Sequence, residues 1–161
     1  KSVIKSDLIT AIQTVQSDRH KLIILLGKFG AGKTVILKQT ADEVGGKYLN
    51  LNMELSEKLL GIPTSQYLDG TTVHAIIDQL CEDASPHQEP LLVDNLEFLF
   101  SPELGKINPI DTFKRISRER AVVIALPAYR QGSSAIYSLS GHEDYAVMPV
   151  EEYIFIEITK E

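Results

Sequence analysis

The sequence predicts a three-layer α/β fold in which helices cover both faces of a parallel five-stranded sheet. Two observations support this prediction. Continuous apolar runs such as LIILL (22–26) and AVVIAL (121–126) have the length of strands that are buried on both faces. Between such runs the apolar residues recur at helical spacing, so strands and helices alternate along the chain and right-handed crossovers are expected.

Helices are predicted on both sides of the first strand. Apolar residues within 6–16 recur at helical spacing, which predicts a short amphipathic helix over one edge or one face of the sheet. The strand 22–26 ends at Gly27. A second helix is expected from about Lys33 to Val44, closed by the glycine pair 45–46.

The middle of the chain contains two further strands. The alternating segment KYLNLN (47–52) predicts the second strand, and Ser56 is a candidate cap for a short helix after it. Apolar residues at helical spacing from Thr71 to Glu82 predict the crossover helix. The apolar run LLVDN (91–95) is then the third strand.

The last third of the chain adds one helix and two strands. Asn108 is a candidate helix cap, followed by a proline and an acidic residue in the first turn, and this helix is expected to reach about Arg118. The fourth strand is 121–126, and YIFIEI (153–158) is the fifth. The segment 127–150 has only a weak helical pattern, and we assign no element there.

The segment GKFGAGKT (27–34) follows the first strand and opens the second helix, and it matches the phosphate-loop pattern GxxxxGKT. Its glycines allow successive backbone N–H groups to face an anionic phosphate. Lys33 can then reach the β- and γ-phosphates, while the Thr34 hydroxyl is placed to bind Mg²⁺. No NKxD-type motif for guanine is found, so we expect a P-loop NTPase that binds ATP. The predicted nucleotide-binding residues are Gly27, Lys28, Phe29, Gly30, Ala31, Gly32, Lys33 and Thr34.

Asp94 stands at the carboxyl end of a buried strand, where α/β sheets present ligand groups. We expect it to hold Mg²⁺ through water while Thr34 holds the cation directly; the alternative is an aspartate that only caps the following loop. Many related ATPases carry a glutamate directly after this aspartate, but here the residue is Asn95, whose amide can orient water without accepting its proton. Glu97 is therefore the candidate general base, with a solvated loop acid as the alternative, and slow hydrolysis is expected.

Arg130 is the candidate arginine finger, a residue that stabilises the γ-phosphate charge from a neighbouring subunit. The basic residues around Arg115 and Arg118 are more simply explained as a helix end favoured by the helix dipole. The fourth strand ends in Leu126 and a proline, so no polar sensor of the γ-phosphate is seen there. The polar run 142–144 is interpreted as a solvated loop, because no second histidine or cysteine lies at metal-ligand spacing.

Length and composition suit one P-loop ATPase domain over residues 1–161. The net charge of −6 disfavours general nucleic-acid binding, so DNA contact is expected only indirectly or through a local basic patch. The lone cysteine, Cys81, lies in an apolar stretch, and a buried thiol fits a reducing cytoplasm. The apolar runs are too short to span a bilayer, so no membrane association is expected.

The chain resembles the BrxF family, small P-loop ATPases of bacterial BREX phage-defence systems. Three segments carry the resemblance: GKFGAGKT, LLVDNLEFLF and ALPAYRQGSSAIYSLSGHEDY. It implies an AAA+-type core of the additional-strand class, with strand order 5-1-4-3-2 and no C-terminal helical lid. It also implies ATP and Mg²⁺ as cofactors and other BREX defence proteins as partners.

Three functions remain open at this point. The first is an ATPase whose nucleotide state controls homo-oligomer assembly and partner engagement. The second is a small-molecule kinase, although such enzymes usually carry an arginine-rich lid and 127–150 holds only Arg130. The third is a nucleotide-gated scaffold that does not hydrolyse ATP, which Asn95 suggests.

Overall fold

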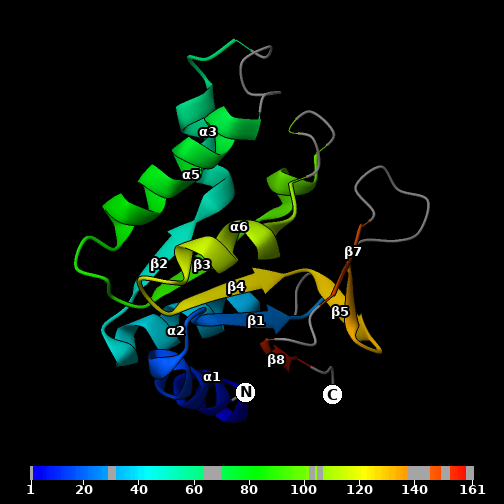
Figure 1. The fold of residues 1–161 in the computed structure, drawn as a ribbon. Helices are drawn as coiled ribbons and strands as arrows, with labels where there is room; N and C mark the ends of the chain where they lie inside the picture. The colour runs from blue at the N-terminus through cyan, green and yellow to red at the C-terminus, as the bar shows by residue number, and fades with distance from the viewer. Residues whose placement is uncertain are drawn as a thin grey trace.

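A five-stranded parallel sheet forms the centre of the molecule (Figure 1). The computed structural model describes residues 2–28, 32–63, 70–101, 104, 107–137, 146–149 and 153–158. The strands lie in the order β2 (Lys47–Asn50), β3 (Leu91–Asp94), β4 (Val122–Leu126), β1 (Leu22–Leu26) and β8 (Ile154–Glu157). Counted along the chain within this sheet, the order is 5-1-4-3-2, as the sequence resemblance implies.

The two central strands are buried along their whole length, because both of their faces are covered. β1 pairs with β4 in register from Leu22 opposite Val122 to Leu26 opposite Leu126. Alternate residues of β1 face opposite sides of the sheet, so Ile23 packs into one apolar cluster and Ile24 into the other. One apolar core therefore lies on each side of the sheet.

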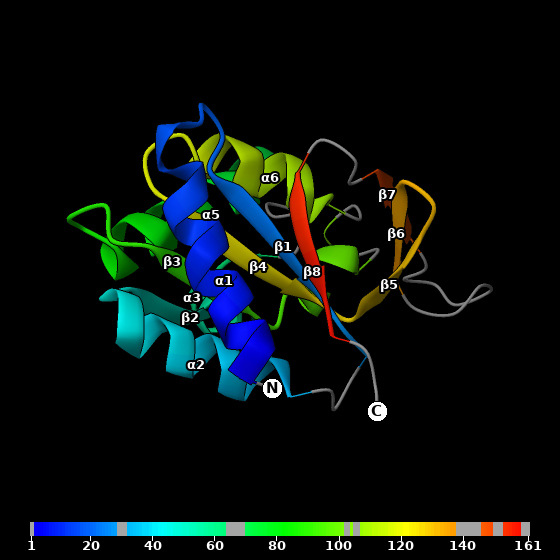
Figure 2. The ribbon, with the colours of Figure 1, turned by 90° about the horizontal axis from the view of Figure 1, so that it is seen from below.

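The helices complete the three layers. On one face lie α1 (Ser2–Thr14) and α2 (Lys33–Val44), which are seen in front of the sheet in Figure 2. The other face is covered by α3 (Leu51–Leu59), α5 (Gly70–Ala84) and α6 (Pro109–Ile116). None of the helices among the described residues combines the length and the apolar character needed to cross a membrane.

The second helix, α2, has the bounds that the sequence predicts. It begins after Gly32, whose φ is +92°, and ends just before Gly45, whose φ is +68°. Glycine adopts this left-handed conformation with little strain, which accounts for its presence at both ends. The first turn of α2 thus lies directly behind the phosphate loop.

The prediction for the second strand was wrong at its C-terminal end. β2 stops at Asn50, and α3 begins at Leu51, so the last two residues of KYLNLN are helical. Asn50 caps this helix, since its side chain accepts a hydrogen bond of 3.2 Å from the Met53 backbone N–H. Ser56, the expected cap, lies inside the helix. Local side-chain capping outweighs the alternating pattern here.

The predicted helix at 108–118 is present but shorter. Asn108 is its cap, accepting a hydrogen bond of 2.9 Å from the Ile110 backbone N–H. The helix ends at Ile116 rather than near Arg118. The predicted crossover helix is α5, which extends slightly past both expected ends.

A second, antiparallel sheet occupies the stretch to which the sequence analysis assigns no element. It consists of β5 (Ala128–Gln131), β6 (Ser134–Tyr137) and β7 (Ala146–Pro149). β5 follows β4 after a single residue, Pro127, and lies beyond the carboxyl ends of β4 and β1 (Figure 1). The proline therefore ends one strand without ending extended structure.

Candidate functional site

The phosphate loop leaves β1 beside the end of β4, where the Gly27 N–H donates to the Leu126 carbonyl at 3.2 Å. The Lys33 ammonium folds back over the loop and donates to the carbonyls of Gly27 and Lys28, both at 2.8 Å. The Lys33 side chain thus lies over the phosphate loop, which directly precedes α2. The predicted contacts of Phe29, Gly30 and Ala31 lie outside the described residues.

Burial and nearby carboxylates act on Lys33 in opposite directions. Loss of hydration lowers the pKa of its ammonium, while the charges of Asp94 and Glu97 raise it. The two carboxylates come from β3 and the turn after it, and the lysine comes from α2. Three charged groups that the sequence predicts as functional are therefore neighbours.

Asp94 ends β3 and is 3% exposed. Its Oδ2 atom accepts a hydrogen bond of 2.5 Å from the Thr34 hydroxyl and one of 2.8 Å from the Tyr48 hydroxyl. Its Oδ1 atom accepts from the Asn95 backbone N–H at 3.0 Å. The two predicted metal ligands, Thr34 and Asp94, are thus in direct contact although 60 residues separate them.

Tyr48 is a site residue that sequence reasoning missed. It lies on β2, and Lys38 of α2 places its ammonium 5.0 Å from the centre of the Tyr48 ring. Burial and the contact with Asp94 raise the pKa of the Tyr48 phenol, so its hydroxyl keeps its proton and acts as a donor. The alternation of KYLN indicated a strand, but it did not indicate which strand lies beside β3.

Asn95 turns the chain at the end of β3. Its φ is +57°, a left-handed conformation that asparagine adopts more readily than most residues. Its backbone carbonyl accepts a hydrogen bond of 2.9 Å from the Asn52 N–H, which ties the turn to the start of α3. A role for its side chain amide in orienting water remains a prediction.

Glu97 begins a short 3-10 helix, Glu97–Phe100. Asn52 contacts the first two residues of this helix: its amide nitrogen donates to Glu97 Oε1 at 3.3 Å, and its amide oxygen accepts from the Phe98 N–H at 2.9 Å. Burial and the charge of Asp94 raise the pKa of Glu97, although its own backbone and Lys33 oppose the shift. A half-buried carboxylate in a fixed position is suited to accept a proton from water. Sequence reasoning missed Asn52, because it was assigned to a strand.

Arg130 lies on β5, and its side chain contacts β8, the edge strand of the parallel sheet. Its guanidinium stacks 3.8 Å from the centre of the Phe155 ring, and its Nε donates to the Gly132 carbonyl at 2.6 Å. Its backbone N–H donates to Glu157 at 3.3 Å. Within the described residues, no contact is seen between Arg130 and the phosphate-loop site of its own chain, so its predicted role concerns a neighbouring subunit.

Two other arginines near the predicted basic helix end form ion pairs. Arg115 pairs with Asp78 at 2.7 Å, and the buried Arg120 pairs with Glu82 at 3.1 Å. These contacts favour a structural role. The polar run 142–144 lies outside the described residues.

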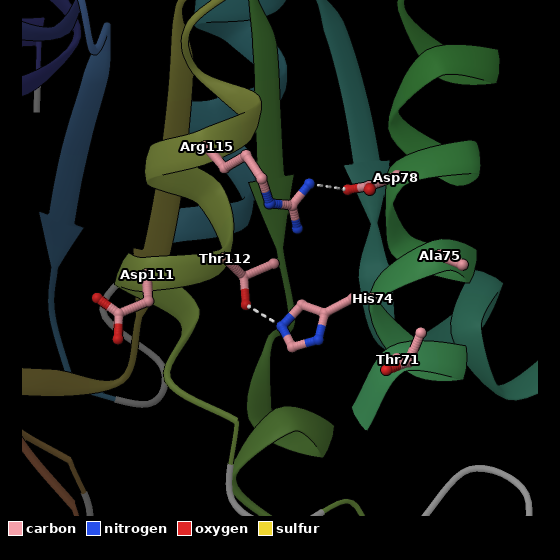
Figure 3. Close-up of a pocket in the computed structure, with 7 residues that line it drawn as sticks. All are labelled: Thr71, His74, Ala75, Asp78, Asp111, Thr112 and Arg115. Atoms are coloured by element: carbon pink, nitrogen blue, oxygen red, sulfur yellow. Dashed lines mark hydrogen bonds and ion pairs between the residues drawn. The ribbon is translucent and has the colours of Figure 1, made fainter. Parts of the chain in front are cut away.

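A groove between α5 and α6 is separate from the phosphate loop (Figure 3). Across it, Arg115 reaches Asp78, and His74 forms a 3.2 Å hydrogen bond with Thr112. Two pairs of polar side chains on its walls are thus engaged with each other. Its lining residues are Thr71, His74, Ala75, Asp78, Asp111, Thr112 and Arg115.

Comparison with known proteins supports the fold. No family model matches the chain, and no curated protein matches it in sequence. Among solved structures it resembles a DNA replication initiation factor, with 16% identity, a TM-score of 0.50 and coverage of 94% of this chain and 44% of that one. AMPPCP-bound DnaA from Aquifex aeolicus and PCH-2 from C. elegans each share 16% identity at a TM-score of 0.47. Both matches cover 98% of this chain, and they cover 44% and 42% of those chains respectively.

The chain therefore spans less than half the length of the solved structures that it matches. At this level of identity the likeness concerns the fold alone. Together with the sheet order, it shows an α/β fold of the P-loop NTPase class with a five-stranded parallel sheet.

Proposed function

We propose that this chain is a Mg-ATP-binding P-loop ATPase that hydrolyses ATP slowly and in an assembly-dependent manner. The observation that carries the proposal is the contact between Thr34 and Asp94. It joins the last residue of the phosphate loop to the carboxylate at the end of β3, and this pair suits a divalent cation next to a bound phosphate.

The donor set around the loop fits the proposed ligands. Lys33 supplies a positive charge over the loop, and the N-terminus of α2 favours an anion. The hydroxyl of Thr34 and the carboxylate of Asp94 are hard oxygen ligands of the kind that Mg²⁺ prefers. When bound, Mg²⁺ would help to neutralise the phosphate charge.

Glu97 is the group best placed to accept the proton of an attacking water. Asn52 fixes its position, and the raised pKa makes it a stronger base than an exposed glutamate. Asn95, directly after Asp94, cannot take this role because an amide does not accept the proton. The amide at the position that directly follows Asp94 supports turnover that is slow in the isolated chain.

Dependence on assembly is supported by the position of Arg130. Its guanidinium lies on Phe155 of β8, the edge strand of the sheet, and no contact joins it to the part of the phosphate-loop site that the structure describes. We propose that it reaches the γ-phosphate bound by a second copy, which makes the active form a nucleotide-dependent homo-oligomer.

The resemblance to BrxF supports a finer proposal. On that basis, the chain acts as a single ATPase domain in the cytoplasm and works with other BREX defence proteins. Contact with DNA would then be indirect, in line with the net charge of −6.

The test is ATP turnover measured across protein concentration for the wild type and the Lys33→Ala, Glu97→Gln and Arg130→Ala variants. We expect the wild-type rate per subunit to rise with concentration, because catalysis in trans requires assembly. Each variant should lose roughly 100-fold or more in rate. Mixing Arg130→Ala with Lys33→Ala should restore part of the activity, because each supplies what the other lacks.

A rate per subunit that is independent of concentration, together with no recovery on mixing, would contradict the role in trans. The second candidate function, a scaffold that does not hydrolyse ATP, is favoured by Asn95. It would show wild-type ATP binding without turnover, and Glu97→Gln would change neither binding nor assembly.

A further inference from the structure

We propose that Tyr48 is a positioning residue for the metal site: its hydroxyl holds the Asp94 carboxylate in the orientation that binds Mg²⁺ together with Thr34. This inference rests on the proposed function, because it concerns the cation that accompanies the nucleotide. It adds to the site a residue of β2, a strand that contributes neither the phosphate loop nor Asp94.

The sheet register brings Tyr48 to Asp94. On β2 and β3, Tyr48 is the partner of Leu92, and Asn50 is the partner of Asp94. Side chains two residues apart on a strand share a face, so Tyr48 and Asp94 lie on the same face of the sheet, one step apart. The phenol spans that step and donates to Asp94 Oδ2 at 2.8 Å.

The helix above this face holds the tyrosine in place. Thr34 and Lys38 are one turn apart on α2 and so project from the same side. Thr34 contacts Asp94, while the Lys38 ammonium covers the Tyr48 ring at 5.0 Å. The ring also packs against the apolar cluster beneath α1 and α2. Tyr48 is therefore fixed on two sides, which makes its hydroxyl a well-oriented donor.

The two hydroxyls on Asp94 have different uses. The Thr34 hydroxyl donates a hydrogen bond to Asp94, which leaves the lone pairs of the threonine oxygen available to a cation. Tyr48 donates to the same carboxylate oxygen, Oδ2, but Tyr48 is not itself a predicted metal ligand. Groups that hydrogen-bond to a metal ligand fix its orientation, and their loss typically weakens metal affinity by about 10- to 100-fold.

The experiment compares Tyr48→Phe with wild type in binding a fluorescent ATP analogue, titrated with Mg²⁺ and repeated in EDTA. We expect the Mg²⁺ concentration at half-effect to rise by about tenfold, with affinity in EDTA and the melting temperature little changed. Phenylalanine retains the ring that packs under Lys38, so the fold should persist. Tyr129→Phe is the matched control, because it removes the same hydroxyl from a ring that is 42% exposed on β5.

A double-mutant cycle separates positioning from a general structural effect. In an Asp94→Asn background, Tyr48→Phe should no longer shift the Mg²⁺ dependence, because the carboxylate it orients is gone. An unchanged Mg²⁺ dependence for Tyr48→Phe, or an equal loss of affinity in EDTA, would overturn the role of Tyr48 while leaving the proposed function intact. Wild type that binds the analogue no better than Lys33→Ala would instead overturn the proposed function, and with it this inference.

Discussion

The two sheets of this protein differ in how they are buried. Every residue of β1 and β4 in the parallel sheet is buried, because helices cover both faces. In the antiparallel sheet, Ala128 is buried but the other three residues of β5 are exposed. The parallel sheet thus carries the cores and the phosphate-loop site, and the antiparallel sheet extends from its carboxyl edge. Burial on two faces leaves a strong apolar signal in a sequence, and burial on one face leaves a weak one.

Contacts at the edge strand β8 join the two sheets. Arg130 of β5 stacks on Phe155, and its backbone N–H donates to Glu157. Two small buried residues of the antiparallel sheet, Ala128 and Ala135, also belong to the large core cluster. We expect the antiparallel sheet to open more easily than the parallel one, because fewer buried groups hold it. Stability measurements can test this difference directly.

Removing core volume should give the largest effect. Ile24 in β1 is 0% exposed and belongs to the large core cluster, so Ile24→Ala is expected to lower the free energy of unfolding by about 3 kcal/mol. The matched change in the antiparallel sheet is Ile136→Ala on β6, where the isoleucine belongs to neither core cluster. We expect a loss below about 2 kcal/mol there. Urea denaturation of both variants measures the difference. Equal losses in the free energy of unfolding would show that the antiparallel sheet contributes as much to stability as the parallel sheet.

A smaller effect is expected at two glycines with left-handed backbone. Gly45 follows α2 with φ of +68°, and Gly132 lies between β5 and β6 with φ of +65°; neither has an atom that a Cβ would meet within 4 Å. Alanine at either position should therefore cost about 1 kcal/mol through strain alone.

The two glycine variants should differ in whether the destabilisation affects global unfolding or only local opening of the antiparallel sheet. Gly45→Ala should lower the urea midpoint of the whole protein, whereas Gly132→Ala should mainly speed amide hydrogen exchange in β5 and β6. Gly61→Ala serves as the control, because its Cβ would also meet open space and its φ is not left-handed. A fall in the urea midpoint as large for Gly132→Ala as for Gly45→Ala would contradict separate opening.

The smallest effect concerns the titration of Glu97 in the site of the parallel sheet. Its pKa is raised in the folded protein, so the stability that it contributes is present at acid pH and is lost as pH rises through that raised value. Glu97→Gln should therefore be more stable than wild type at neutral pH and equal to it below the ordinary glutamate pKa of 4.5. Urea denaturation across pH measures this, with the exposed Glu57→Gln as control. A gain that persists unchanged at acid pH would contradict the assignment to ionisation.

Much of the parallel sheet could be predicted because its strands are continuous apolar runs and its helices have clear periodicity. The end of β2 could not, because Asn50 caps a helix whose apolar residues also continue the alternation of the strand. In the antiparallel sheet, β5 escaped prediction because three of its four residues are exposed and it lacks a continuous apolar run. At the site, the motif residues Lys33 and Thr34 were identifiable, whereas Tyr48 and Asn52 have no motif and become visible only through their contacts.

The sequence by itself determined the phosphate loop, the alternation of helices and buried strands, and the candidate carboxylates, because local pattern and glycine placement are written in consecutive residues. Only the tertiary structure decided that Thr34 meets Asp94, that Tyr48 joins them from β2, and that Asn52 holds Glu97. Those contacts depend on strand order and register, which bring together residues about 45 to 60 positions apart. Pairings of that range arise from packing the whole sheet, and no local segment encodes them.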